Sequence, residues 1–212
     1  MIDKPGQQLL LNFPSRPEHD FSNFVVSDGS RIAFETAKEF CSGSQVSFQS
    51  LYIFGQKNLG KTHLLLSIGN LSAKNGSRAV CIEGSDFANK VKDSESLEAR
   101  NTLDQLLDVD FFLMDNVEGI AHSSTAQEKL YHIYNQITEK GGKLAFTASL
   151  PPDKNSAMES YLTSRFQWGM VAEIKPIDDA TTAKIIVKLA MDISLIMPEP
   201  IINFLLSRIP RD

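Results

Sequence analysis

The residues with the clearest chemical meaning in this 212-residue chain are the eight from Gly55 to Thr62. They fit the pattern Gly-x-x-x-x-Gly-Lys-Ser/Thr and separate an apolar run from a leucine-rich stretch. Glycines let a backbone wrap a phosphate chain, and amides at a helix N-terminus add partial positive charge. Lys61 would reach the terminal phosphates and Thr62 would bind Mg²⁺. The flanking strand and helix disfavour a chance match in a turn, so the pattern predicts a site for a nucleotide with at least two phosphates, formed by Gly55, Gln56, Lys57, Asn58, Leu59, Gly60, Lys61 and Thr62.

Asp115 is the acidic residue that could complete this site. It ends a second apolar run, and ligands bind at the carboxyl ends of parallel strands, so we expect it to hold Mg²⁺ together with Thr62. The alternative is a carboxylate that caps the following loop. In many P-loop ATPases that form rings, a second carboxylate follows and polarises the attacking water. Asn116 stands there instead, and an amide orients water without taking its proton. We therefore expect slow hydrolysis by the chain alone, unless the nearby Glu118 substitutes.

Arg165 lies at the end of a predicted helix and just before an apolar strand. Its spacing alone favours a surface arginine stabilised by the helix dipole. An arginine at this place could also enter the nucleotide site of a neighbouring molecule and neutralise charge in the transition state, as an arginine finger does. The residues beside it leave both interpretations open.

Short apolar strands that alternate with helices must position these residues. This alternation is typical of a parallel sheet with helices on both faces, which predicts an α/β fold. The five predicted strands cover residues 51–54, 79–82, 111–114, 144–147 and 170–174. Helices are predicted at 31–41 and 61–71, after each of the next three strands, and, beyond Pro176, at 181–191 and 199–207.

The two ends of the chain differ from this core. Prolines and a glycine break residues 1–20, which we interpret as a flexible arm carrying the apolar segment Leu9–Phe13. The helices after Pro176 indicate the beginning of a small helical domain. The chain is therefore divided into an arm, a nucleotide-binding core and part of a helical domain, with the ranges 1–20, 21–176 and 177–212.

The composition limits the partners. The formal net charge is −5, with 21 basic and 26 acidic residues, so direct binding to duplex DNA is not expected. The segment 84–108 holds six acidic and three basic residues, which makes it a poor groove for single-stranded DNA. Two cysteines are too few for a disulfide scaffold, and no stretch approaches a membrane-spanning length. A cytoplasmic protein without membrane contacts is expected.

The motifs together resemble the AAA+ core of the DnaA family of replication initiators. The resemblance rests on four segments and covers nearly the whole chain: residues 21–26, 54–65, 115–121 and 162–169. It implies a P-loop AAA+ core with a five-stranded parallel sheet flanked by helices, followed by a partial helical lid. It also implies bound ADP or ATP with Mg²⁺, contacts to the nucleotide from Phe24, Val25 and His63, and the finger role for Arg165.

Within the family the likeness is closest to the Hda-type regulator. Residues 115–118, Asp-Asn-Val-Glu, resemble the Asp-Asn-Ile-Glu of such regulators. Residues 8–13, Gln-Leu-Leu-Leu-Asn-Phe, resemble the peptide with which many bacterial proteins bind the sliding clamp of the replicase. Such a peptide docks a glutamine through hydrogen bonds and its apolar side chains in a pocket. This implies clamp binding through Gln8, Leu9, Leu11 and Phe13; the alternative is an arm that packs on its own domain.

The resemblance implies that the chain, bound to the clamp, offers Arg165 to ATP held by DnaA and promotes its hydrolysis, which restrains initiation. One alternative is an autonomous ATPase or a DnaC-like helicase loader. Another is an adaptor in which the nucleotide is structural. The sequence leaves open whether homodimers form.

Three positions depart from the family pattern. Ser149 and Leu150 stand where a sensor Asp and Arg are common, which changes nucleotide sensing, with Ser149 as the remaining contact. Tyr161 replaces an arginine four residues before the finger. A sensor arginine of the lid would fall beyond Asp212, the last residue of the sequence.

Overall fold

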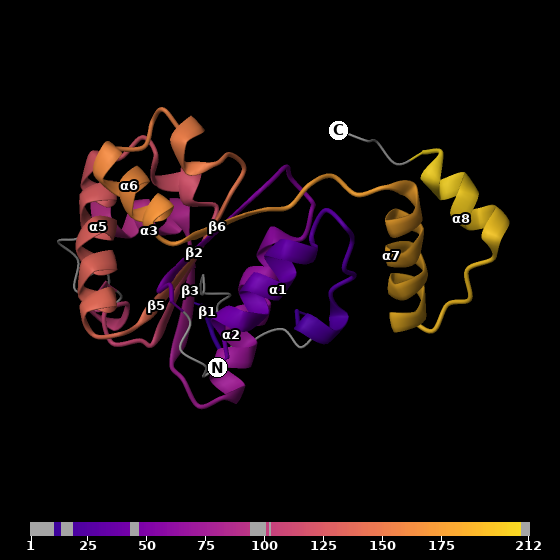
Figure 1. Ribbon diagram of the computed structural model, residues 1–212, viewed down its shortest axis with the longest axis horizontal. Coiled ribbons are helices and arrows are strands. Elements are labelled where there is room, and N and C mark those ends of the chain that lie inside the picture. The colour runs from indigo at the N-terminus through magenta and orange to yellow at the C-terminus, as the bar shows by residue number, and fades with distance from the viewer. Residues whose placement is uncertain (1–10, 14–18, 43–46, 94–100, 102, 209–212) are drawn as a thin grey trace, which may run out of the picture.

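A six-stranded sheet forms the centre of the protein (Figure 1). The computed structural model describes residues 11–13, 19–42, 47–93, 101 and 103–208. The strand order is β1-β3-β4-β5-β2-β6. The strands are β1 (Leu11–Asn12), β2 (Ser50–Phe54), β3 (Ala79–Glu83), β4 (Phe111–Asp115), β5 (Lys143–Ala148) and β6 (Met170–Glu173).

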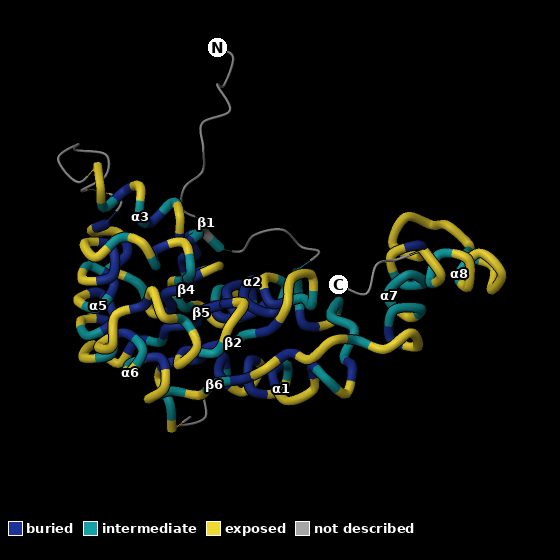
Figure 2. Tube along the Cα trace, turned by 90° about the horizontal axis from the view of Figure 1, so that it is seen from above, coloured by how far each residue is buried: buried dark blue, intermediate teal, exposed yellow. Residues whose placement is uncertain are grey.

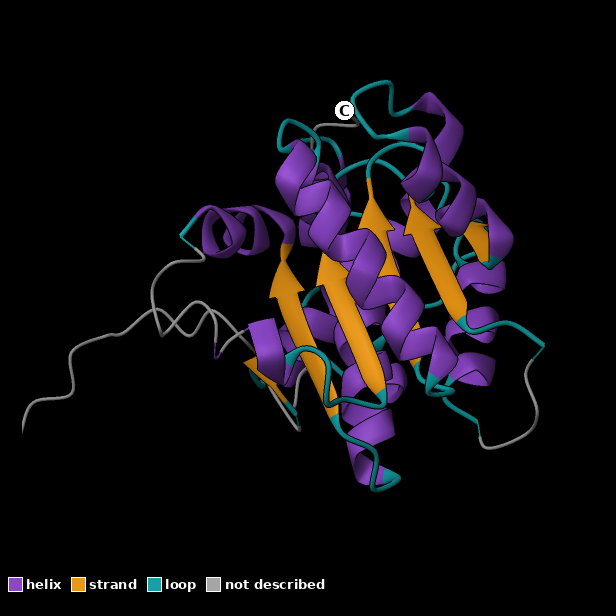
Figure 3. Cartoon of the chain, turned by 90° about the vertical axis from the view of Figure 1, so that its left-hand side faces the viewer, coloured by secondary structure: helices purple, strands orange, loops and turns teal. Residues whose placement is uncertain are grey.

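The five predicted strands, β2 to β6, are all parallel (Figure 3). Alternation along them divides the core. Leu51 and Ile53 face one hydrophobic cluster, while Tyr52 faces the other. Because successive side chains of a strand point to opposite faces, both faces of the sheet need a cover of helices. This confirms the α/β fold.

Helices α1 (Arg31–Phe40) and α2 (Lys61–Lys74) cover one face. Helices α3 (Gly84–Lys92), α5 (Ser124–Glu139) and α6 (Ser160–Trp168) cover the other (Figure 1). In α1 the buried residues Ala33, Ala37 and Phe40 recur three and four positions apart, which is the spacing of one helix face. Short 3₁₀ helices η1 (Phe21–Asn23), η2 (Val117–Ile120) and η3 (Pro152–Lys154) connect these elements.

The first strand lies within residues 1–20, which the sequence predicts to be a flexible arm. Leu11 and Asn12 form β1, which pairs antiparallel with the edge strand β3 and places Leu11 opposite Cys81. The ring of Phe13 packs against the α1–α2 side of the core. A two-residue edge strand has too short a pattern to be recognised from sequence. Residues 11–13 thus pack on the core. Gln8 and Leu9 lie outside the described residues.

Two helices follow the last strand, α7 (Asp179–Asp192) and α8 (Glu199–Leu206). Asp178 begins α7 by accepting a hydrogen bond from the backbone N–H of Thr181 at 2.7 Å. Both helices extend away from the sheet, and most of their residues are exposed or half-buried (Figure 2). In the described part of the chain, no helix has the length and hydropathy needed to cross a membrane.

Candidate nucleotide-binding site

The loop from Gly55 to Gly60 joins the end of β2 to the start of α2, as the sequence pattern requires. Gly60 precedes α2 with a φ of +91°, a conformation open to glycine, and a side chain there would collide with the Phe24 ring. Gly55 passes so close to the carbonyl of Ile174 that a side chain would not fit. The two glycines are therefore required by the path of the loop.

Lys61 is buried at the first position of α2, and its ammonium group closes the loop. Its Nζ donates hydrogen bonds to the carbonyl oxygens of Gly55 at 2.7 Å and Gln56 at 2.6 Å. Burial lowers the pKa of Lys61, and the negative charges of Glu118 and Asp115 oppose this shift. A phosphate group here would meet a partly desolvated cation, for which charge-assisted hydrogen bonds are strong.

Thr62 and Asp115 are brought together across the ends of α2 and β4. The hydroxyl of Thr62 donates to the two carboxylate oxygens of Asp115 at 2.8 and 3.1 Å. A hydroxyl and a carboxylate are the hard oxygen donors that Mg²⁺ binds, so this pair fits the predicted ion. Among the described residues no group of three or more His, Cys, Asp or Glu could hold a metal, so Mg²⁺ here would need phosphate oxygens as further ligands.

Thr147 is a member of this site that sequence reasoning missed. Its hydroxyl donates to Asp115 and accepts from the backbone N–H of Asn116 at 2.9 Å. Thr147 is fully buried near the end of β5, and β5 is the neighbour of β4 in the sheet. The two strands are far apart in sequence, so only their pairing reveals this contact.

Asn116 and Glu118 follow Asp115 and open η2. Asn116 has a φ of +49°, a left-handed conformation that asparagine tolerates. Glu118 turns back toward β5, where its carboxylate accepts a hydrogen bond from the backbone N–H of Ser149. The structure thus places Ser149 and Glu118 together, and the charge of Glu118 acts on Lys61. Position 116 carries an amide, but the carboxylate of Glu118 still lies close to the phosphate-binding loop.

A cavity of about 310 Å³ adjoins the loop and is closed on one side by α7. Phe24, Val25 and His63, the residues that the sequence predicts to contact the nucleotide, line this cavity. The sequence did not indicate its lid wall, which includes Lys188. The Nζ of Lys188 donates to the side-chain oxygen of Asn23 at 3.2 Å, which connects α7 to η1 across the cavity. Further lining residues are His19, Asn58, Leu59, Gly60, Ile177, Ile185 and Leu189.

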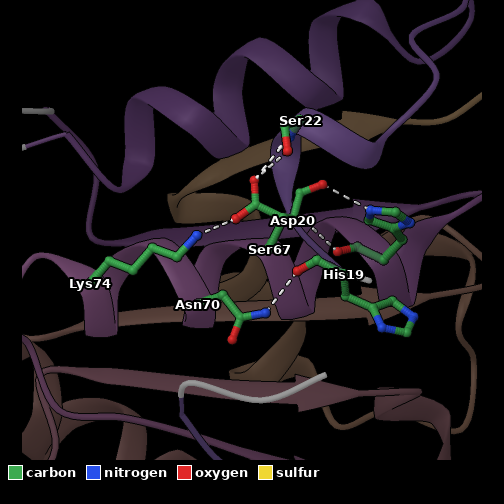
Figure 4. A network of polar contacts seen from close by, with 7 residues as sticks. His19, Asp20, Ser22, Ser67, Asn70 and Lys74 are labelled. Carbon is green, nitrogen blue, oxygen red and sulfur yellow. Dashed lines mark hydrogen bonds and ion pairs between the residues drawn. The ribbon is translucent and has the colours of Figure 1, made fainter. Parts of the chain in front are cut away.

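A polar network attaches the segment before η1 to α2 (Figure 4). Lys74 forms an ion pair with Asp20 at 2.5 Å, and Asn70 donates to the carbonyl of His19 at 2.7 Å. The side-chain hydrogen bond from Lys74 is the main cause that lowers the pKa of Asp20 to about 2. His63 Nε2 lies 3.1 Å from the carbonyl oxygen of Asp20, and burial lowers the pKa of His63. These contacts hold the segment before Phe24 against α2, and this segment forms one wall of the cavity.

Arg165 is not part of this site. It lies in the last turn of α6, lining with Ser50 a second cavity of about 430 Å³. Ser50 begins β2 and Gly55 follows its end, so the two residues are about 17 Å apart along the strand at about 3.3 Å per residue. Arg165 therefore lies near the amino end of β2, whereas the phosphate-binding loop of its own chain follows the carboxyl end of that strand.

Of the four residues predicted for a partner peptide, Leu11 and Phe13 fall in the described part of the chain. The Phe13 ring lies on α2 at Gly69, where an added methyl group would collide with it. In this structure Phe13 packs on its own domain, which is the alternative that the sequence leaves open, while Gln8 and Leu9 lie outside the described residues.

Comparison with known proteins shows where this architecture recurs. The family described as the bacterial DnaA ATPase domain matches residues 16–173. The chromosomal replication initiator protein DnaA of Campylobacter fetus is 31% identical over 181 residues, which is 85% of this chain and 41% of that protein. The chain therefore spans less than half the length of this relative.

Solved structures agree. AMPPCP-bound DnaA from Aquifex aeolicus matches with a TM-score of 0.83 and 27% identity, over 92% of this chain and 62% of that one. Domain III of the Thermotoga maritima replication initiation protein DnaA matches with a TM-score of 0.82 and 32% identity, over 91% of this chain and 82% of that one.

Proposed function

The chain belongs to the bacterial DnaA ATPase-domain family, and from this premise we propose that it is a nucleotide-binding paralogue of DnaA that restrains replication initiation. It acts by binding the sliding clamp and promoting hydrolysis of the ATP that DnaA holds. The observation that carries the proposal is the position of Arg165, which lies at the opposite end of β2 from the phosphate-binding loop.

The ligand of the chain itself is ADP or ATP with Mg²⁺. Lys61 would bind the terminal phosphates, while Thr62 and Asp115 would hold the ion. The cavity between Phe24, His63 and α7 would take the base. The relative from Aquifex aeolicus, which is described as bound to AMPPCP, supports an adenine nucleotide at this place. Mg²⁺, when bound, neutralises phosphate charge.

Arg165 supplies the catalytic contribution in trans. Ser50, which lines the same cavity as Arg165, lies about 17 Å along β2 from Gly55, so the guanidinium would serve a nucleotide that another molecule presents beside α6. A planar, permanently charged guanidinium stabilises the charge that develops on a phosphoryl group during transfer. The composite site would then hold the partner's ATP, with this chain as its activator.

Two features of the sequence favour a regulator. Asn116 replaces the second carboxylate, so turnover of the chain's own nucleotide lacks a proton acceptor at that position. The arm carries the clamp-binding-like residues Gln8 and Phe13, which would bring an acidic chain to DNA through the clamp.

The experiment that tests the proposal measures hydrolysis of DnaA-bound ATP, with and without this protein and with and without DNA-loaded clamp. The proposal expects acceleration only when all three proteins are present. An unchanged rate in the complete mixture would refute it. Clamp pull-down with Gln8 and Phe13 replaced by alanine tests the tether separately, because binding that persists would exclude those residues.

Autonomous ATP hydrolysis is a second candidate, favoured by the position of Glu118. Its carboxylate reaches Ser149 on the loop side of the site and could accept a proton in place of residue 116. The assay is ATP turnover by the purified protein alone. This candidate predicts rapid turnover that Glu118→Gln abolishes. The regulator predicts slow turnover that Asn116→Asp raises, since aspartate also tolerates the left-handed conformation.

A further inference from the structure

Three aromatic rings surround the guanidinium of Arg165. Its Cζ lies 4.8 Å from the ring centroid of Trp168, 5.5 Å from that of Tyr131 and 6.0 Å from that of Tyr134. Tyr131 and Tyr134 come from α5, whereas Trp168 belongs to α6 and follows Arg165 by three residues. All three distances fall within the range of cation–π attraction.

The rings take the place of hydrogen bonds to part of this cation. Among the described residues the buried Nε of Arg165 has no hydrogen-bond partner. A buried polar group without a partner is costly, and the negative faces of aromatic rings offset part of that cost for a cation. The contact therefore includes a cation–π attraction in addition to apolar packing.

The walls of this cluster differ in how firmly they are held. Tyr134 is buried and its hydroxyl donates to the backbone carbonyl of Arg165 at 3.2 Å, which fixes the base of the side chain. Tyr131 packs edge-on against Tyr161, with ring centroids 5.1 Å apart. Trp168 is 78% exposed, so burial of the indole does not explain its place over the guanidinium. Tyr134 therefore holds the buried side of the cluster, whereas Trp168 lies on its solvent-exposed side.

We propose that Tyr131, Tyr134 and Trp168 form an aromatic cage that positions Arg165 for a nucleotide phosphate presented by a partner molecule. The inference rests on the proposed function and deepens it by naming the residues that hold the finger. The cage limits the rotamers of a long side chain, which lowers the entropy lost when the finger engages. The rings cover the faces of the guanidinium, whereas phosphate oxygens accept charge-assisted hydrogen bonds from N–H groups in its plane, so the guanidinium can engage a phosphate while it stays in the cage.

The first test needs no partner. Trp168 is the only tryptophan of the chain, so its fluorescence reports on the cage alone. Arg165→Met removes the flat cation and keeps the aliphatic stem, which should raise the acrylamide quenching constant of Trp168. Arg78→Met is the matched control, because Arg78 pairs with the exposed Asp108 on the surface. Equal quenching in wild type and Arg165→Met would overturn the cage.

The second test measures the finger at work, as the rate of DnaA-bound ATP hydrolysis against the concentration of this protein. Loss of one ring contact should lower the maximum rate about 2- to 5-fold in Trp168→Leu and leave the half-saturating concentration unchanged. Trp168→Phe should recover most of the rate, because phenylalanine keeps a ring face.

A raised half-saturating concentration at an unchanged maximum rate would instead make Trp168 a simple docking contact and overturn the positioning role. Equal rates for Trp168→Leu and Trp168→Phe would do the same, because the ring face would then be irrelevant. If wild-type protein fails to accelerate hydrolysis, the proposed function fails, while the fluorescence comparison still decides whether the cage exists.

Discussion

Thr147 on β5 donates its hydroxyl hydrogen bond to Asp115 on β4. The same hydroxyl accepts from the backbone N–H of Asn116 at 2.9 Å, and Asp115 accepts from Thr62 at 2.8 Å. The hydrogen bonds of Asp115 with Thr62 and Thr147 thus connect the start of α2 with two neighbouring strands. Because every link is a side chain at a strand or helix end, the position of Asp115, the carboxylate proposed to bind Mg²⁺, depends on the sheet itself.

Thr147→Val should weaken nucleotide binding in the presence of Mg²⁺. Valine keeps the shape of threonine, but it leaves the carboxylate of Asp115 and the buried N–H of Asn116 each without one partner. Leaving such a group unpaired costs about 1–3 kcal/mol, which corresponds to a loss of affinity of about 5- to 150-fold. Calorimetric titration with ATP checks this.

The control for this variant is Thr138→Val, which removes a hydroxyl that bonds only to carbonyls within α5. It should bind nucleotide normally. Since the carboxylate acts through the ion, we also expect the defect of Thr147→Val to shrink when EDTA is present. A defect of equal size with and without Mg²⁺ would show that Thr147 supports the fold and has no role in placing the ion.

The nucleotide site was predictable wherever its residues are local in sequence. Residues 55–62 carry their own strand and helix signals, and Asp115 ends an apolar run, so the sequence places both at the carboxyl edge of the sheet. Thr147 was missed because its role depends on β5 lying beside β4, and the residues of a strand do not reveal which strand will be its neighbour in the sheet. Lys188 was missed for a similar reason, because it reaches the site from the lid helix.

At the N-terminal arm the sequence-based prediction differs from the structure in another way. Its sequence indicates a free segment, yet Leu11 and Asn12 pair with β3 and Phe13 lies on Gly69. An exposed strand edge accepts any short segment that can reach it, so pairing depends on geometry more than on side-chain pattern. The same residues would be needed for binding to a clamp, so the two uses of the segment compete.

Gly69→Ala should therefore strengthen binding to the clamp. The new methyl group would collide with the Phe13 ring and release it from α2. Half-burial of a phenylalanine contributes about 1 kcal/mol, so the Kd for the clamp should fall about fivefold. Surface plasmon resonance on immobilised clamp measures this. Combining Gly69→Ala with Phe13→Ala should remove binding, and a Gly69→Ala protein that binds more weakly than wild type would exclude the competition.

Lys74→Met should change how stability depends on pH. The bond from Lys74 is the largest of the causes that lower the pKa of Asp20 from its ordinary 3.8 to about 2, and hydrogen bonds from Ser22 add to it. A carboxyl group with a lowered pKa in the folded state stabilises the fold above about pH 4, and this contribution is lost as the pH falls toward about 2. The pair is partly exposed, so its loss should cost about 1 kcal/mol at pH 6 and little near pH 2.

Urea unfolding at several pH values measures this difference. Arg31→Met is the matched control, because Arg31 pairs with the fully exposed Asp28 and its loss should cost almost nothing at any pH. If Lys74→Met and wild type differ by the same free energy at pH 6 and near pH 2, the ion pair is not the cause of the difference.

The central claim is that Arg165 acts on a nucleotide held by another molecule, and one comparison tests it most directly. The measurement is the rate at which DnaA hydrolyses prebound radiolabelled ATP in the presence of DNA-loaded clamp and either wild-type protein or Arg165→Ala. Arginine fingers contribute about 10³- to 10⁵-fold, so the account predicts that Arg165→Ala loses at least about a hundredfold of the acceleration while its own nucleotide and clamp binding stay intact. Equal acceleration by wild type and Arg165→Ala would contradict it.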